Sequence, residues 1–187
     1  MVDSKLGPVI HTERLMLRPP AAEDFAGFTL FHADEETMRF LGGVQSAPVV
    51  WRSMRAAAGA WALDGFGMFS VVEKASGDWI GRIGPIHPHG WPGREVGWGL
   101  HSSYWGRGFA QEAVVAAMDF AFDRLGWDHA IHTIDPKNER SLALARRLGS
   151  VRQGPGALPE PFAAQTVDIW GQSAADWWTR NRGKLLA

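Results

Sequence analysis

The chain contains no cysteine, and this absence removes several kinds of chemistry from consideration. It can form no disulfide, and it has no thiol to carry a covalent acyl group. Tyrosine occurs once, at Tyr104, in a segment just before a glycine-rich turn. We expect this side chain to pack rather than to act as a catalytic acid.

Excess charge and long apolar runs are also absent. The 19 basic and 20 acidic side chains leave a net charge of −1, which provides no global field for nucleic acid or an anionic membrane. Neither the amino-terminal segment nor any other has an apolar run long enough for a membrane span, which predicts a cytoplasmic protein. With 45% apolar residues, the 187-residue chain can fill the core of a single domain, residues 1–187.

The order of predicted elements indicates a mixed α/β fold in which neighbouring strands form an antiparallel meander. Apolar periodicity and capping residues predict helices over 22–33, 35–41, 51–62, 110–125 and 138–148. Alternating apolar stretches between turn residues predict strands over 15–18, 68–73, 79–86, 95–100, 130–134 and 167–170. Residues 154–161 contain Gly-Pro-Gly and are expected to form a long loop.

The stretch YWGRGFAQEA, residues 104–113, places two glycines between the strand at 95–100 and a helix. Gly106 and Gly108 would let the backbone approach a phosphate without a Cβ in the way. Free N–H groups of the first helical turn would then point at the anion, and Arg107 would add a mobile positive charge.

Spacing separates the phosphate-binding motifs that this stretch could represent. A Walker loop needs Lys-Ser/Thr after its second glycine, where this chain has Phe109-Ala110, and a dinucleotide fingerprint needs glycine at Gln111. The remaining pattern resembles the pyrophosphate loop of the GCN5-related N-acetyltransferases (GNAT), although Trp105 departs from the Gln or Arg of its first position. The alternative is an ordinary glycine-rich turn before a surface helix.

Four further segments resemble the same family in the family's own order, covering roughly residues 12 to 150. They are TERLMLRP at 12–19, DEETMRFLGG at 34–43, WIGRIG at 79–84, and NERS at 138–141 with a helix ending at Leu148-Gly149. The chain is identified as similar to the RimJ/RimL-like branch, which acetylates ribosomal-protein N-termini and other amines. This resemblance implies the GNAT fold, a central mixed, mostly antiparallel splayed sheet flanked by helices, with acetyl-CoA as cosubstrate.

The resemblance also implies which residues hold the cofactor. The glycine-containing strand would splay from its neighbour and pair with the pantetheine arm, and one of its N–H groups would polarise the thioester carbonyl. A bulge at a sheet edge is the alternative. The implied residues are Trp98, Gly99, Leu100, Trp105, Gly106, Arg107, Gly108, Phe109, Ala110, Asn138 and Ser141.

Asn138 is also a predicted helix N-cap from its residue type alone. Its amide would reach the pantetheine, and Ser141 would lie near the sulfur. Lys137 and Arg140 are candidates for the adenosine phosphates, or are simply solvated.

Without a cysteine nucleophile, the acceptor amine would attack the thioester directly. Many family members protonate the leaving sulfur with a tyrosine, and Ala145 stands at that position here, so Ser141 is the candidate. Glu95 could accept the amine's proton through water if its pKa is raised, or it could be a salt-bridged or solvated strand end. Glu160 and His87 are further candidates for the base.

The acceptor is expected to be a primary amine on a protein N-terminus or a small molecule, and the protein a monomer or homodimer. Several tryptophans, including Trp51, Trp61 and Trp91, lie where the family walls its acceptor site, although core packing explains them equally well. The histidine spacings at 87–89 and 129–132 are not specific for metal, and we expect none. A catalytically inactive CoA-binding or sensing module is the second hypothesis.

Overall fold

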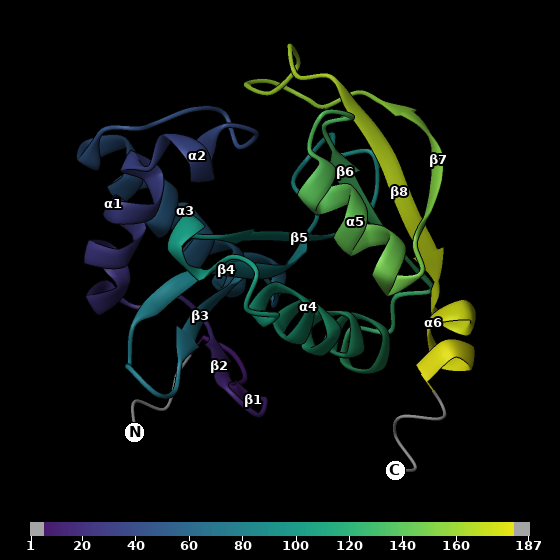
Figure 1. Cartoon of the computed structure of the whole chain (residues 1–187), viewed down its shortest axis with the longest axis horizontal. Helices are drawn as coiled ribbons and strands as arrows, with labels where there is room; N and C mark the ends of the chain where they lie inside the picture. The colour runs from purple at the N-terminus through teal and green to yellow at the C-terminus, as the bar shows by residue number, and fades with distance from the viewer. Residues whose placement is uncertain (1–5, 182–187) are drawn as a thin grey trace. The chain divides into compact units, whose positions relative to one another are not determined.

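The computed structural model describes residues 6–181 and contains both helices and strands along the chain (Figure 1). The helices are η1 (Ala22–Asp24), α1 (Phe25–Ala33), α2 (Glu35–Met38), α3 (Ala47–Asp64), η2 (Ser102–Tyr104), α4 (Phe109–Asp119), η3 (Phe120–Arg124), α5 (Glu139–Leu148) and α6 (Ala174–Asn181). The strands are β1 (Ile10–His11), β2 (Leu15–Arg18), β3 (Phe69–Glu73), β4 (Trp79–Ile86), β5 (Glu95–Leu100), β6 (His129–Ile134), β7 (Val151–Gly156) and β8 (Val167–Ser173).

The chain forms two compact units, and strand β5 contributes to both. Unit 1 contains the residues up to Ile86 together with Gly97–Ala117, and unit 2 contains His87–Val96 and the residues from Met118 on. The hydrogen-bonded strand order is β1-β2-β3-β4-β5 through unit 1 and β5-β6-β8-β7 through unit 2. Most of these pairings are antiparallel, whereas β5 pairs with β6 in parallel.

In unit 1, β2 buries one face, whereas the next strand, β3, is buried along its whole length. In β2, Leu15 and Leu17 are fully buried while their neighbours are partly exposed, as the period of two along a strand requires. Helices α1 and α3 pack against each other through Phe28, Val50 and Met54. The predicted strand at 15–18 and the bounds predicted for β4 and β5 are confirmed.

A buried polar cluster fixes the start of the helical segment in unit 1. Asp24 is only 3% exposed and accepts hydrogen bonds from both terminal nitrogens of Arg18, at 2.8 and 2.6 Å. Ser70 Oγ donates to the same carboxylate at 2.6 Å and accepts from Trp79 Nε1 at 2.9 Å. These bonds satisfy a carboxylate that burial would otherwise make costly.

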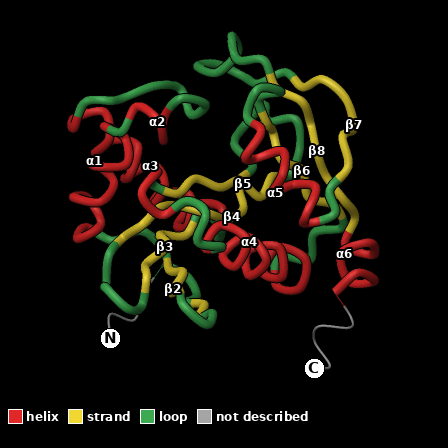
Figure 2. The backbone as a smooth tube through the Cα atoms, in the orientation of Figure 1, coloured by secondary structure: helices red, strands yellow, loops and turns green. Residues whose placement is uncertain are grey.

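Unit 2 contains the first two residues of β5 and the strands β6, β8 and β7. Strands β7 and β8 run side by side as an antiparallel pair (Figure 2), and β8 also pairs with β6 over six register positions. Helix α5 buries Leu142, Ala145 and Leu148, which recur at helical spacing on one face. It ends at the predicted stop, Gly149, whose φ of 92° is a left-handed conformation that glycine adopts readily.

The predicted loop at 154–161 is wrong in its first part, because residues 154–156 belong to β7. Proline and glycine are turn signals, but this strand lies at the edge of the sheet order. An edge strand pairs with a neighbour on one side only, so a proline there does not remove a hydrogen bond to a second strand. A register shift between Arg152 and Gly154 accommodates the irregular sequence.

Several predicted helix bounds also need correction. The helix predicted at 51–62, with its end near residues 64–65, is α3, which starts earlier, after Ser46 and with a proline in its first turn. Its last residue is Asp64 and its C-cap is Gly65, as predicted. The predicted helix at 35–41 ends at Met38, and the first residues of 22–33 form the 3-10 turn η1. The helix predicted at 110–125 is α4 followed by the π-helical turn η3, while β1 and α6 had no predicted counterpart.

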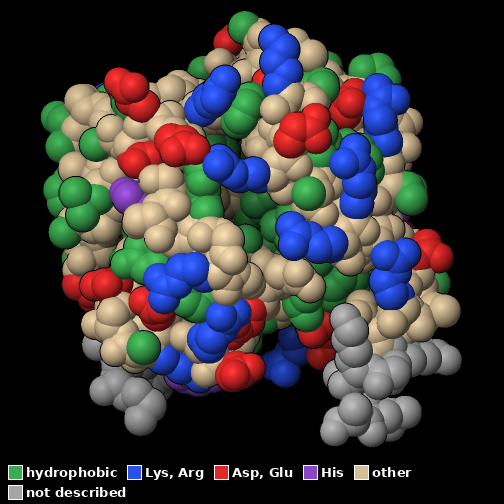
Figure 3. All heavy atoms as spheres, viewed as in Figure 1, with side chains coloured by type: hydrophobic (Ala, Val, Ile, Leu, Met, Phe, Trp, Pro, Cys, Tyr) green, Lys and Arg blue, Asp and Glu red, His purple; other side chains and the backbone are tan. Residues whose placement is uncertain are grey.

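Across residues 6–181, no helix is both long and apolar enough to cross a membrane. On the face shown in Figure 3, basic and acidic side chains lie interspersed, in keeping with the nearly balanced charge of the sequence.

Candidate functional site

The glycine loop of unit 1 follows η2 and leads directly into α4. Gly106 and Gly108 have φ values of 74° and 82°, a region that residues with a Cβ rarely adopt. A Cβ added at Gly106 would meet no atom within 4 Å, so the backbone conformation alone calls for glycine there. The loop therefore exposes its backbone at the start of a helix, which is the geometry of an anion site.

The side chain of Arg107, predicted to add a positive charge at this loop, is paired with a glutamate in the structure. Its Nη2 donates to Glu73 Oε1 on β3 at 2.8 Å, and its guanidinium lies 4.6 Å from the ring centroid of the buried Phe109. The side chain is thus anchored on two sides. Sequence reasoning missed this pairing because Glu73 lies on a distant strand.

The strand segment before the loop is held closely in unit 1. A Cβ added at Gly99 would come 3.0 Å from Phe31, so no larger residue fits without movement. The Leu100 carbonyl accepts a hydrogen bond from Trp105 Nε1 at 2.8 Å. Trp105, which departs from the family pattern, thereby ties the loop to the end of β5.

A contact that the sequence did not predict joins the amino-terminal turn to this loop. Arg14 Nε donates to Glu112 Oε2 at 2.7 Å, and Arg14 Nη1 donates to the Arg107 carbonyl at 2.9 Å. Glu112 lies in the first turn of α4. Arg14 and Glu112 are 98 positions apart, so no local pattern could have indicated this pair.

In unit 2, the start of α5 forms as predicted. Asn138 is the N-cap, and its side-chain oxygen accepts from the Ser141 backbone N–H at 3.2 Å. Ser141 is half-buried in the first turn. Ala145, at the position of the family's tyrosine, is fully buried, so a side chain there faces the core of the unit.

Glu95 opens β5 as a buried carboxylate. It is 5% exposed, and its Oε2 accepts from Trp91 Nε1 at 2.6 Å and from Thr133 Oγ1 at 2.9 Å. Burial raises the pKa of Glu95 to about 7, although both hydrogen bonds oppose the shift. The alternative of a solvated strand end is therefore wrong.

The next residue along β5 is tied to a buried histidine. His132 Nδ1 lies 2.7 Å from the Val96 carbonyl and Nε2 lies 2.9 Å from Ser150 Oγ, which also accepts from Gln172. Burial lowers the pKa of His132 to about 4, so the ring is neutral near pH 7 and donates from Nδ1 to the carbonyl. Strand β5 shares the register pair Glu95↔Ile131 with β6.

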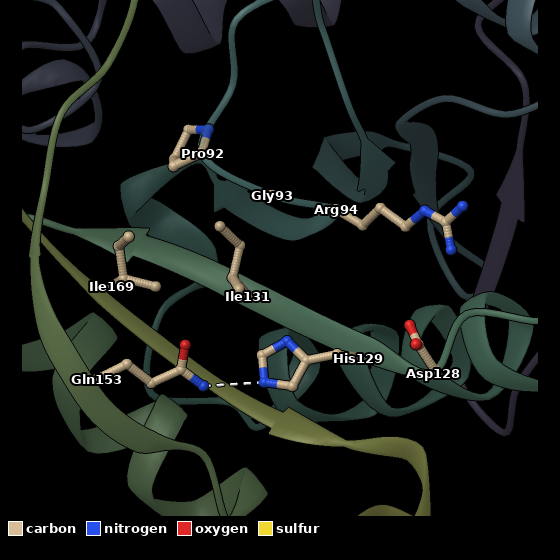
Figure 4. Close-up of a pocket in the computed structure, with 8 residues that line it drawn as sticks. All are labelled: Pro92, Gly93, Arg94, Asp128, His129, Ile131, Gln153 and Ile169. Atoms are coloured by element: carbon tan, nitrogen blue, oxygen red, sulfur yellow. Dashed lines mark hydrogen bonds between the residues drawn. The ribbon is translucent and has the colours of Figure 1, made fainter.

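Unit 2 also has a shallow hollow of about 380 Å³ on the sheet (Figure 4). Its lining residues are Pro92, Gly93, Arg94, Asp128, His129, Ile131, Gln153 and Ile169. His129 and Gln153 are hydrogen-bonded at 2.9 Å across it. Ile131 and Thr133 are two positions apart on β6 and share a face, so this hollow lies on the face of β6 from which Thr133 contacts Glu95.

The other two candidates for the base are not hydrogen-bond partners of Glu95. His87 and Glu160 lie in unit 2 outside its helices and strands. Within residues 6–181 there is no group of three or more His, Asp or Glu side chains placed to hold a metal ion.

Comparison with solved structures first defines the class of fold, which is that of acetyltransferases. An acetyltransferase from Agrobacterium tumefaciens superposes with a TM-score of 0.75 at 31% identity, covering 88% of this chain and 94% of that one. A ribosomal-protein-S5-alanine acetyltransferase from Vibrio fischeri shares the fold, with a TM-score of 0.68 at 20% identity over 91% and 98% of the two chains.

Sequence comparison then identifies the family. The acetyltransferase (GNAT) domain model matches residues 14–151, so the chain belongs to the GNAT acetyltransferase family. The uncharacterized N-acetyltransferase p20 of Bacillus licheniformis is 29% identical over 164 residues, 86% of this chain and 92% of that protein. The predicted GNAT membership and fold class are confirmed.

Proposed function

We propose that this chain is an acetyl-CoA-dependent N-acetyltransferase of the RimJ/RimL-like kind, which transfers an acetyl group directly to a primary amine. Family membership supports acetyl transfer in general. The observation that carries the more specific proposal is Glu95, a buried carboxylate with a pKa of about 7 at the start of the glycine-containing strand.

A base for amine acetylation must accept a proton and then release it near neutral pH. An ordinary glutamate is a weak base because its pKa is far below that of an ammonium group. Glu95 is better matched, since burial raises its proton affinity while Trp91 and Thr133 fix the carboxylate in place. Neither of these two neighbours carries a charge that would pull the pKa down again.

The reaction is a direct displacement in which atoms and charge balance. The amine nitrogen attacks the thioester carbonyl carbon, a C–N bond forms, and the tetrahedral oxyanion is stabilised by a backbone N–H among Trp98, Gly99 and Leu100. The C–S bond then breaks and CoA leaves as a thiolate. The proton lost by the nitrogen passes through water to Glu95.

Acetyl-CoA, when bound, supplies the activated acetyl group. We assign its pyrophosphate to the loop formed by Trp105, Gly106, Arg107 and Gly108 and to the first residues of α4, Phe109 and Ala110. The exposed backbone of this loop supports the assignment. Asn138 and Ser141 are assigned to the pantetheine arm and the sulfur on the resemblance, with Asn138 also serving as the cap of α5.

The proposal is tested by release of free thiol from acetyl-CoA in the presence of a panel of amines. The panel should contain peptides with free N-termini, polyamines and small amines, and the protein adds no thiol background because it lacks cysteine. Acceptor-dependent thiol release is the expected result. Tight acetyl-CoA binding without turnover on any amine would instead identify a binding or sensing module.

A further inference from the structure

Arg14, in the turn between β1 and β2, places a guanidinium against the glycine loop. One terminal nitrogen donates to the Arg107 carbonyl at 2.9 Å, and the guanidinium lies 4.6 Å from the ring centroid of Phe109. A Cβ added at Gly108 would come 3.3 Å from the other terminal nitrogen, Nη2. Arg14 therefore contacts the loop from a segment nearly 100 positions away.

The same arginine neutralises a carboxylate at the start of α4. Glu112 Oε2 accepts from Arg14 Nε at 2.7 Å, and its Oε1 accepts from the Arg14 backbone N–H at 2.8 Å and from Thr12 Oγ1 at 2.6 Å. Burial alone would raise the pKa of Glu112, but the hydrogen bonds from Thr12 and Arg14 outweigh it and lower the pKa. The carboxylate is ionised, with its charge engaged on both oxygens.

An anion at the glycine loop would be repelled by two nearby groups, the Arg107 carbonyl dipole and the Glu112 carboxylate. Arg14 engages both of them at once. The Arg107 side chain is already paired with Glu73, so it is not available for the same task without breaking that pair.

We propose that Arg14 is the positioning residue of the glycine loop, which directs the Arg107 carbonyl away from the anion and offsets the charge of Glu112, so that the loop binds the pyrophosphate of coenzyme A. This inference rests on the proposed function and deepens it. Arg14 thus sets cofactor affinity from the amino-terminal turn.

An arginine with only a structural role would not change cofactor affinity when it is replaced. The chain offers such an arginine as a matched control. Arg152 in unit 2 forms a two-pronged pair with Asp168, both bonds at 2.7 Å. The side-chain exposures are 52% and 13% for this pair, against 43% and 16% for Arg14 and Glu112. Loss of either arginine removes a similar ion pair, but only Arg14 contacts the loop.

The experiment is calorimetric titration of acetyl-CoA into the full chain and into Arg14→Gln, Arg14→Lys and Arg152→Gln. Arg14→Gln should weaken binding about tenfold or more, the scale of one charge-assisted hydrogen bond. Arg14→Lys should lose less affinity, because it keeps the positive charge. It should still lose some, because lysine lacks the planar fork that donates to two acceptors. Arg152→Gln should bind like the parent.

A second-site variant separates charge compensation from folding. Glu112→Gln removes the repulsive carboxylate, so adding it to Arg14→Gln should recover part of the lost affinity, although it removes a further anchor of the turn. If Arg14→Gln does not fold, acetyl-CoA affinity is compared between the parent, Arg14→Lys and Glu112→Gln instead. Binding by Arg14→Gln as tight as by Arg152→Gln, or a double variant weaker than Arg14→Gln, overturns the inference. Absence of binding by the parent chain would overturn the proposed function itself.

Discussion

Glu95 meets two opposing demands, because the burial that suits it as a base also makes its charged form unfavourable. Glu95→Gln keeps the shape of the side chain, and one amide oxygen can accept from both Trp91 and Thr133, which in the parent share Oε2. It removes only the proton acceptor. We expect turnover to fall by roughly 10²-fold or more with little change in acetyl-CoA affinity.

The measurement is a pH–rate profile with two acceptor amines of different pKa, since ionisation of the amine itself also produces an acidic limb. The limb due to Glu95 should lie near pH 7 for both amines and vanish in the variant. Turnover near that of the parent across this series would assign Glu95 to structure and leave His87, Glu160 or water as the route for the proton.

The same substitution should stabilise the protein, and only at higher pH. Glu95 keeps its proton to about pH 7 when folded, against 4.5 as its ordinary value, so in this window the folded state binds more protons than the unfolded state. Stability therefore falls as pH rises from 4.5 to 7, by an amount on the order of 3 kcal/mol. Thermal unfolding should show Glu95→Gln above the parent at pH 8 and close to it at pH 5. A difference that does not depend on pH would contradict the raised pKa.

At the scale of elements, we predict that a substitution in the glycine loop has an effect on cofactor binding that backbone strain alone would not produce. Gly106→Asp puts a negative charge where a pyrophosphate is proposed, in a backbone conformation with φ of 74°. Gly77→Asp is a matched control, because its φ is 78° and a Cβ there also meets nothing within 4 Å. Both should lose similar stability, on the order of 1 kcal/mol.

Only Gly106→Asp should lose acetyl-CoA binding, as measured by calorimetry at a temperature where both variants are folded. Equal affinities in the two variants would remove the loop from the cofactor site.

Local patterns predicted those elements whose signals lie within a few residues. Asn138 was predicted as a cap from its residue type, and the structure gives it a partner, Ser141, only three positions away. Strands β4 and β5 are bounded by turn residues at both ends. The same reasoning predicted β7 wrongly, because Gly154 and Pro155 are turn signals but are tolerated in an edge strand.

Contacts between distant segments explain what the sequence could not predict about the site. One hydrogen bond to Glu95 comes from Thr133, 38 positions later, and the pairing of Arg14 with Glu112 spans 98 positions. Residue type alone therefore left the Glu95 carboxylate equally open to a catalytic role and to that of a salt-bridged or solvated strand end. Arg14 had no local signal that would have singled it out from the other arginines.

For the whole molecule, acetyl-CoA should raise the melting temperature, because a ligand that binds only the folded state stabilises it by mass action. At a concentration of 100 times its dissociation constant, the gain is about 2.7 kcal/mol, which corresponds to several degrees for a chain of this size. Pantetheine at the same concentration is the control, since it lacks the pyrophosphate. An equal shift with pantetheine would place the binding energy away from the glycine loop.

The path of the chain through the two units has a consequence for synthesis on the ribosome. Every residue of unit 1 has been made once Ala117 is added, whereas His87–Val96, which belong to unit 2, must wait for partners from Met118 onward. Trp91 is available to Glu95 at once, but Ile131 and Thr133 emerge only later. The buried carboxylate at the start of β5 is therefore among the last parts of its strand to leave water during translation.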